Sequence, residues 1–72
     1  MTPDERQRIK DIRAKAKDDG RVLMVAMCDR AIWGLVPVQI WRELTEAERL
    51  VVGKMTQTEA VTAVLVQAQD AT

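Results

Sequence analysis

The segment from Gly20 to Leu44, GRVLMVAMCDRAIWGLVPVQIWREL, constrains the fold of this chain more than any other feature. Every position from Val22 to Cys28 is apolar, and Asp29 and Arg30 are the only charges between there and Trp41. A short continuous apolar run fits a buried strand and a buried helix equally well. Two structures are therefore open for this segment.

The first structure is a β-hairpin, in which strands Val22–Met27 and Ala31–Val36 pair around a turn at Cys28–Arg30. The β-branched and aromatic residues of both runs favour strands, and a residue that precedes proline prefers an extended backbone. The second structure is one helix, favoured by a Met- and Ala-rich composition and by a stop pattern of Gly34 followed by Pro37. We expect the hairpin.

The flanking segments carry helix signals. Pro3 suits a first helical position, and Gly20 can adopt the left-handed conformation that stops a helix. A bend is expected near Gly53. Three capping boxes are present, namely Thr2 to Glu5, Thr45 to Glu48 and Thr56 to Glu59. The sequence therefore predicts an α+β fold: an N-terminal helix, a two-stranded antiparallel β-hairpin, then two or three short C-terminal helices. The alternative is an all-α helical bundle.

Composition excludes most enzyme classes. The 72 residues form one small domain, residues 1–72, and contain one Cys and no His, Tyr, Ser or Asn. Catalytic triads, imidazole acid–base pairs and His/Cys zinc sites are thereby excluded, so we expect no enzyme activity, no cofactor and no metal. The longest uncharged run is too short to span a bilayer, which favours a cytoplasmic protein without membrane contact.

The N-terminal helix carries a basic stripe. Arg6, Lys10, Arg13 and Lys17 are spaced by four, three and four residues, which places them on one helix face. Such a stripe is either a solvated face or a surface that contacts nucleic-acid phosphates. Equal numbers of acidic and basic residues in the whole chain weaken the second interpretation.

Residues 20–44 also contain an order of glycine, apolar, basic and proline residues that occurs in a known protein family. The matching residues are Gly20, Val22, Leu23, Val25, Arg30, Ile32, Leu35, Val36, Pro37, Trp41 and Leu44. This order resembles the Phd/YefM (prevent-host-death) antitoxins, although Asp29 replaces the usual turn glycine. The resemblance implies a dimer that binds its operator through N-terminal basic residues and neutralises a toxin with its C-terminal segment. Arg6, Arg8, Lys10 and Arg13 occupy the corresponding place.

The chain has two aromatic residues, Trp33 and Trp41, and a half-exposed tryptophan would mark a binding face. The expected partner-binding residues are Trp33, Trp41, Arg42, Val61, Val64 and Leu65. We therefore predict a small non-enzymatic protein-binding module, an inhibitor or adaptor such as a phage-encoded blocker of a host enzyme, that acts through an apolar surface and forms a homo-oligomer. The alternative is an antitoxin-like transcription regulator whose basic stripe binds DNA.

Overall fold

The structure, a computed structural model, describes residues 1–70 and the side chains of residues 1–67. Its five helices are α1 (Pro3–Asp18), α2 (Val22–Trp33), α3 (Val38–Glu43), α4 (Glu46–Gly53) and α5 (Gln57–Asp70). No strand occurs among the described residues, so the predicted α+β class is wrong and the fold is all-helical.

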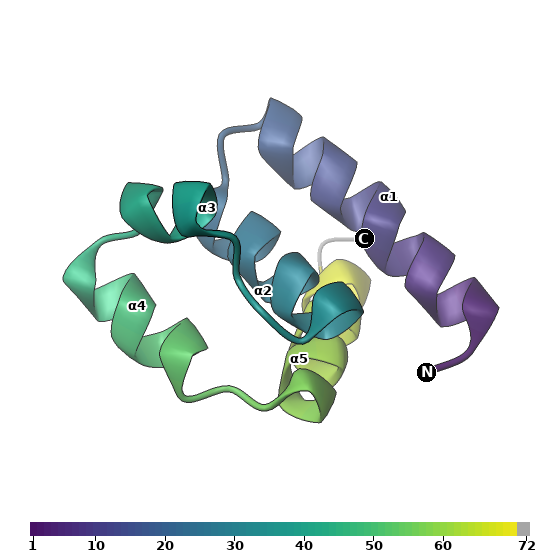
Figure 1. Cartoon of the computed structure of the whole chain (residues 1–72). Coiled ribbons are helices and arrows are strands. Elements are labelled where there is room, and N and C mark those ends of the chain that lie inside the picture. Colours follow the sequence, from purple (N-terminus) through teal and green to yellow (C-terminus); the bar gives the residue numbers. More distant parts are fainter. Residues whose placement is uncertain (71–72) are drawn as a thin grey trace.

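Helix α2 lies at the centre of the molecule (Figure 1). Both long helices, α1 and α5, pack against it, and the short helices α3 and α4 contact it as well. Helices α1 and α2 run in opposite directions, because only the short turn at residues 19–21 joins them. Each of the other helices therefore depends on α2 for its main packing partner.

Helix α1 begins and ends as its sequence predicts. The hydroxyl of Thr2 accepts the backbone N–H of Glu5 at 3.2 Å, and the Glu5 carboxylate accepts the backbone N–H of Thr2 at 3.0 Å. Gly20 has a φ of +73°, in the left-handed region. The N–H of Arg21 donates to the carbonyl of Ala16 over 2.8 Å, which completes a Schellman-type end.

The predicted hairpin is wrong, because residues 22–33 form the single helix α2. A helix that is covered on several sides has no polar face, so it loses the periodicity that would distinguish it from a strand. The charges that suggested a turn, Asp29 and Arg30, lie inside the helix and have partners of their own. Gly34, with a φ of +76°, ends α2 in the left-handed conformation.

The structure of the C-terminal half agrees better with the predictions made from the sequence. Both further capping boxes form, since Thr45 pairs with Glu48 and Thr56 with Glu59. The predicted bend near Gly53 is confirmed, because α4 ends at this residue and α5 begins at Gln57. These starts and stops divide the segment after Pro37 into three helices.

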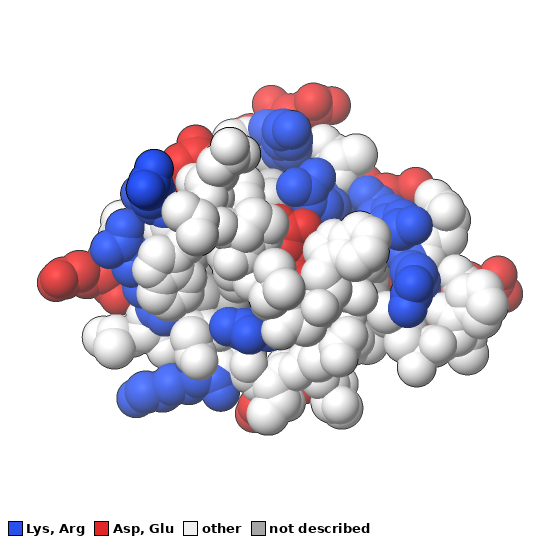
Figure 2. All heavy atoms as spheres, viewed as in Figure 1, with Lys and Arg blue, Asp and Glu red and all other residues white. Residues whose placement is uncertain are grey.

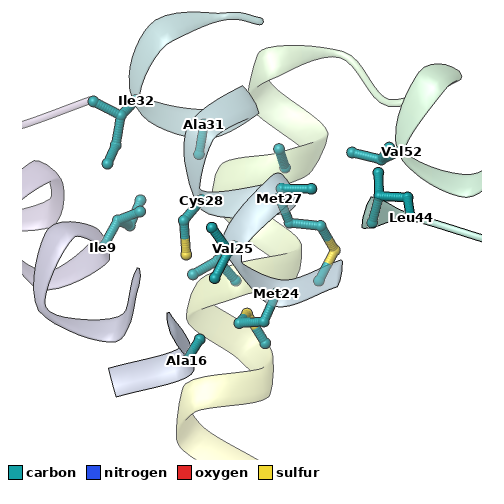
Figure 3. Packing of buried hydrophobic residues seen from close by; sticks show 13 residues of the cluster. Ile9, Ala16, Met24, Val25, Met27, Cys28, Ala31, Ile32, Leu44 and Val52 are labelled. Carbon is teal, nitrogen blue, oxygen red and sulfur yellow. The ribbon is translucent and has the colours of Figure 1, made fainter. Parts of the chain in front are cut away.

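The core surrounds α2 (Figure 3). Ile9 of α1 points toward Cys28 and Val25 of α2, whereas Val52 of α4 and Leu44 approach from the other side. The buried apolar residues are Ile9, Ala16, Met24, Val25, Ala26, Met27, Cys28, Ala31, Ile32, Leu44, Val52, Ala60 and Val64. Neither tryptophan is among them.

Candidate protein-binding surface

Trp33 is the last residue of α2, and its side chain is exposed. It retains 60% of its accessible surface, although it is one of only two aromatic residues in the chain. Its neighbours Ala31 and Ile32 point into the core and are buried. The helix thus sends its largest side chain outward at the position where the backbone turns at Gly34.

The linker from Gly34 to Pro37 extends this apolar surface. Val36 packs against the core, while Leu35 is 55% exposed. Val38, at the start of α3, is 63% exposed. We call the exposed side chains of Trp33, Leu35 and Val38 the linker ridge.

A partly buried ion pair joins α1 to α2, one turn before Trp33. The Nε of Arg13 donates to Oδ1 of Asp29 at 2.6 Å, and Nη2 contacts Oδ2 at 3.5 Å. Asp29 is 1% exposed, whereas the side chain of Arg13 is 30% exposed. A two-point guanidinium–carboxylate contact fixes the relative orientation of its partners. Arg13 therefore holds α1 in register with α2.

The three other cations of the predicted stripe, Arg6, Lys10 and Lys17, are exposed on the same face of α1. We call them the basic row. Figure 2 shows Lys and Arg side chains spaced along α1 beside uncharged surface over α2. The structure thus keeps three members of the stripe in solvent and assigns the fourth, Arg13, to the ion pair.

Arg30 connects the linker to α4. Its Nη1 donates to the carbonyl of Gly34 at 3.0 Å, and its Nη2 contacts the carbonyl of Val52 at 3.5 Å. Its Nε is buried and has no hydrogen-bond partner among the residues that the structure describes. Nearby, Nε2 of Gln57 donates to the carbonyl of Ala31 at 3.0 Å. These bonds fix the backbone that carries Trp33.

Trp41 is half-buried and is held by α4. The guanidinium of Arg49 lies 5.8 Å from the centre of its ring, and Nε of Arg49 donates to the Trp41 carbonyl at 3.0 Å. The ring passes so close to Gly53 that a β-carbon there would stand 3.4 Å from it. Trp41 therefore anchors α3 to α4. Its neighbour Arg42 is exposed.

The predicted partner-binding residues of α5 have separate roles. Val64 is fully buried and belongs to the core, whereas Val61 and Leu65 are half-buried at its edge. The structure therefore does not bring Trp33, Trp41 and the α5 residues together on one exposed face. Sequence reasoning missed Leu35 and Val38, although the extended geometry expected before Pro37 is the signal that could have indicated an outward Leu35.

Cys28 offers no reactive thiol. Burial raises the pKa of this thiol to about 12, with a further contribution from the charge of Asp29. A protonated thiol is a poor nucleophile. Within the described part of the chain, no group of three His, Cys, Asp or Glu residues could hold a metal ion, and no helix is long and apolar enough to cross a membrane.

Comparisons with known proteins return no relative. No protein-family model matches the chain, and no curated protein or solved structure is significantly similar to it. The resemblance of residues 20–44 to the Phd/YefM antitoxins stays a prediction, and the hairpin that formed part of that pattern is a helix. The functional proposal therefore rests on the geometry of this chain alone.

Proposed function

We propose that this chain is a small non-enzymatic protein-binding module, an inhibitor or adaptor, whose binding face is the linker ridge. The observation that carries the proposal is the 60% exposure of Trp33 next to the exposed Leu35 and Val38. Tryptophan is enriched among the residues that dominate binding energy at protein interfaces. Exposed apolar side chains that adjoin one another are also more typical of interaction sites than of ordinary surface.

The rigidity of the ridge supports the same proposal. Gly34 and Arg30 fix the turn after Trp33 through a left-handed backbone and a hydrogen bond. Val36 fastens the middle of the linker to the core. A preformed surface loses little conformational entropy on binding, which favours affinity.

We further propose that the module forms homo-oligomers. Two other exposed apolar side chains, Leu50 and Val51, lie on α4. A small core supplies limited stability, so cover for these residues by a second copy would be favourable. Sedimentation velocity at micromolar concentration should show a dimer or larger ring, and Leu50→Asp should shift it to monomer. A folded wild-type monomer at that concentration would contradict oligomer formation.

The binding face can be tested with a displayed library of random peptides selected on the immobilised chain. Peptides that use the linker ridge should lose roughly tenfold or more in affinity for Trp33→Ala, as expected for an interface anchor. The matched control is Val66→Ala, which removes part of an exposed apolar side chain on α5 and should leave their affinity unchanged. Selected peptides that all bind Trp33→Ala as well as wild type would show that the ridge is not the binding face.

The DNA-binding alternative has less support. The ion pair with Asp29 takes Arg13 from the predicted stripe, so only the other three cations of the stripe face solvent. The chain as a whole is also neutral. Duplex DNA should therefore be added as a competitor in the peptide-binding experiments, where we expect it not to displace the peptides.

A further inference from the structure

We infer that the linker ridge and the basic row form one docking surface, and that its occupant is an acidic amphipathic helix of another protein. This inference rests on the proposed function and adds the chemistry of the partner. Three observations carry it: the two features lie side by side, the flank of α1 that faces the ridge is cationic, and the ridge is partly aliphatic.

The ion pair between Arg13 and Asp29 places the two features on the same side of the molecule. On α1, Lys10 and Lys17 of the basic row lie one turn to either side of Arg13, and Arg6 lies two turns before it. On α2, Trp33 lies one turn beyond Asp29. Because the helices are antiparallel, the turn of α1 before Arg13, which carries Lys10, lies opposite the end of α2, which carries Trp33.

Buried contacts agree with this register. Ile9, which precedes Lys10, and Ile32, which precedes Trp33, lie in the same core cluster between α1 and α2. The side chains of Lys10 and Trp33 then leave the helix pair at the same level. Figure 2 shows uncharged surface beside the cations of α1, with a small acidic patch at the centre of this face.

The charge of this surface selects an acidic partner. Along α1 the basic row is not interrupted by acidic residues, because Asp4, Asp11 and Asp18 recur every seven residues on a different side of the helix. Glu43 of α3 shares a pocket with Lys17, so the unopposed cations of the row are Arg6 and Lys10. Asp29 is buried and its charge is matched by Arg13. Complementary potentials accelerate association and exclude partners of the wrong sign. Carboxylates on the occupant would therefore face the basic row while apolar side chains contact the ridge.

The length of the basic row matches a partner helix of about three turns. Arg6 and Lys17 are eleven positions apart on α1, a span of about 16 Å at 1.5 Å per residue. A helix with carboxylates at every third or fourth position along one flank could pair with the row throughout. An adjacent apolar stripe on that helix would reach Trp33 and Leu35.

Two other occupants are less compatible with these observations. A second copy docked through the same face would bring two basic rows together, which costs free energy through repulsion of like charges. A nucleic-acid strand could stack a base on Trp33 and pair phosphates with the row. It has no aliphatic groups for the exposed Leu35 and Val38, whereas a protein helix has.

The test uses the Trp33-dependent peptides selected as described above. They should be enriched in Asp and Glu, and their affinity should fall as salt concentration rises. The double variant Arg6→Glu/Lys10→Glu should weaken their binding roughly tenfold. The matched control, Arg8→Glu/Lys15→Glu, reverses two exposed charges on the opposite side of α1 and should change binding by less than about twofold. Thermal unfolding of each variant confirms that it is folded.

The outcomes separate the inference from the proposed function. Trp33-dependent peptides that are not acidic and that bind the double variant normally would overturn the inference and leave the proposed function intact. The absence of any Trp33-dependent peptide would overturn both. Binding of fluorescent oligothymidine to the wild type, if both Trp33→Ala and the double variant abolish it, would assign the surface to nucleic acid. Self-association abolished by Trp33→Ala would assign it to a second copy.

Discussion

The guanidinium of Arg13 and the buried carboxylate of Asp29 join α1 to α2 across a gap of sixteen residues in the sequence, with an Nε to Oδ1 distance of 2.6 Å. This contact removes Arg13 from the solvent-facing stripe and gives it a structural role. It also determines which turn of α1 lies beside Trp33.

Loss of Arg13 should therefore destabilise the fold. Arg13→Ala leaves the carboxylate of Asp29 buried without its cation, which should lower the free energy of unfolding by about 1–3 kcal/mol. Urea denaturation followed by circular dichroism measures the change. Lys10→Ala, one turn away and exposed, is the matched control and should stay within about 0.5 kcal/mol of wild type. Equal effects of the two substitutions would mean that the pair contributes nothing.

The environment of Trp33 should be visible in its fluorescence. Trp41→Phe leaves Trp33 as the only tryptophan, and an exposed indole should emit at long wavelength and be accessible to quenchers. Because cations raise the local concentration of anions, iodide should quench it more than caesium does. Lys10→Glu should reduce this difference, whereas Lys15→Glu should preserve it. Equal quenching by both ions in the parent would place the basic row away from Trp33.

The capping carboxylates should contribute to acid sensitivity. Hydrogen bonds from Thr2 lower the pKa of Glu5 below 4.5, and those from Thr56 do the same for Glu59. A carboxyl group whose pKa is lower in the folded state than in the unfolded state stabilises the fold at any pH above its unfolded pKa. This stabilisation is lost as pH falls through its folded pKa. Glu5→Gln/Glu59→Gln should thus flatten the decrease in melting temperature below pH 4.5. Glu43→Gln, at an exposed position outside the boxes, should leave it unchanged.

Cys28 should report on opening of the core. With its pKa raised to about 12, the buried thiol stays protonated in the folded chain at pH 8, so alkylation by iodoacetamide should require transient exposure. The unfolded thiol ionises near 9.0, so stability should also decrease as pH rises from about 9 toward 12. Cys28→Ala should remove that alkaline dependence. Alkylation as fast as in urea would contradict the buried position.

Local signals predicted the ends of the helices, whereas the identity of the central element was missed. The Thr–Glu boxes and Gly20 act over one turn, so sequence alone reveals them. Helix α2 has neighbours on several sides, and its apolar composition reflects packing by α1, α4 and α5 rather than a local backbone preference.

The candidate site was predicted in part for the same reason. Trp33 and the basic residues were recognisable by type, and their spacing placed the cations on one face. The pairing of Arg13 with Asp29 could not be predicted, because it depends on how two helices pack in space. The burial of Val64 and the exposure of Leu35 likewise follow from the tertiary arrangement.

Arg30 shows how two helices can be held together by a cation that has no carboxylate partner among the described residues. The last peptide groups of a helix carry a partial negative charge, and Arg30 donates to the carbonyl of Gly34 after α2 and contacts that of Val52 in the last turn of α4. One planar cation thus bridges two negative helix ends that are distant in sequence. Lysine presents a single ammonium instead of a fork, so it could not serve both carbonyls in this geometry. The relative placement of α2 and α4 therefore depends on backbone dipoles as well as on the shapes of side chains.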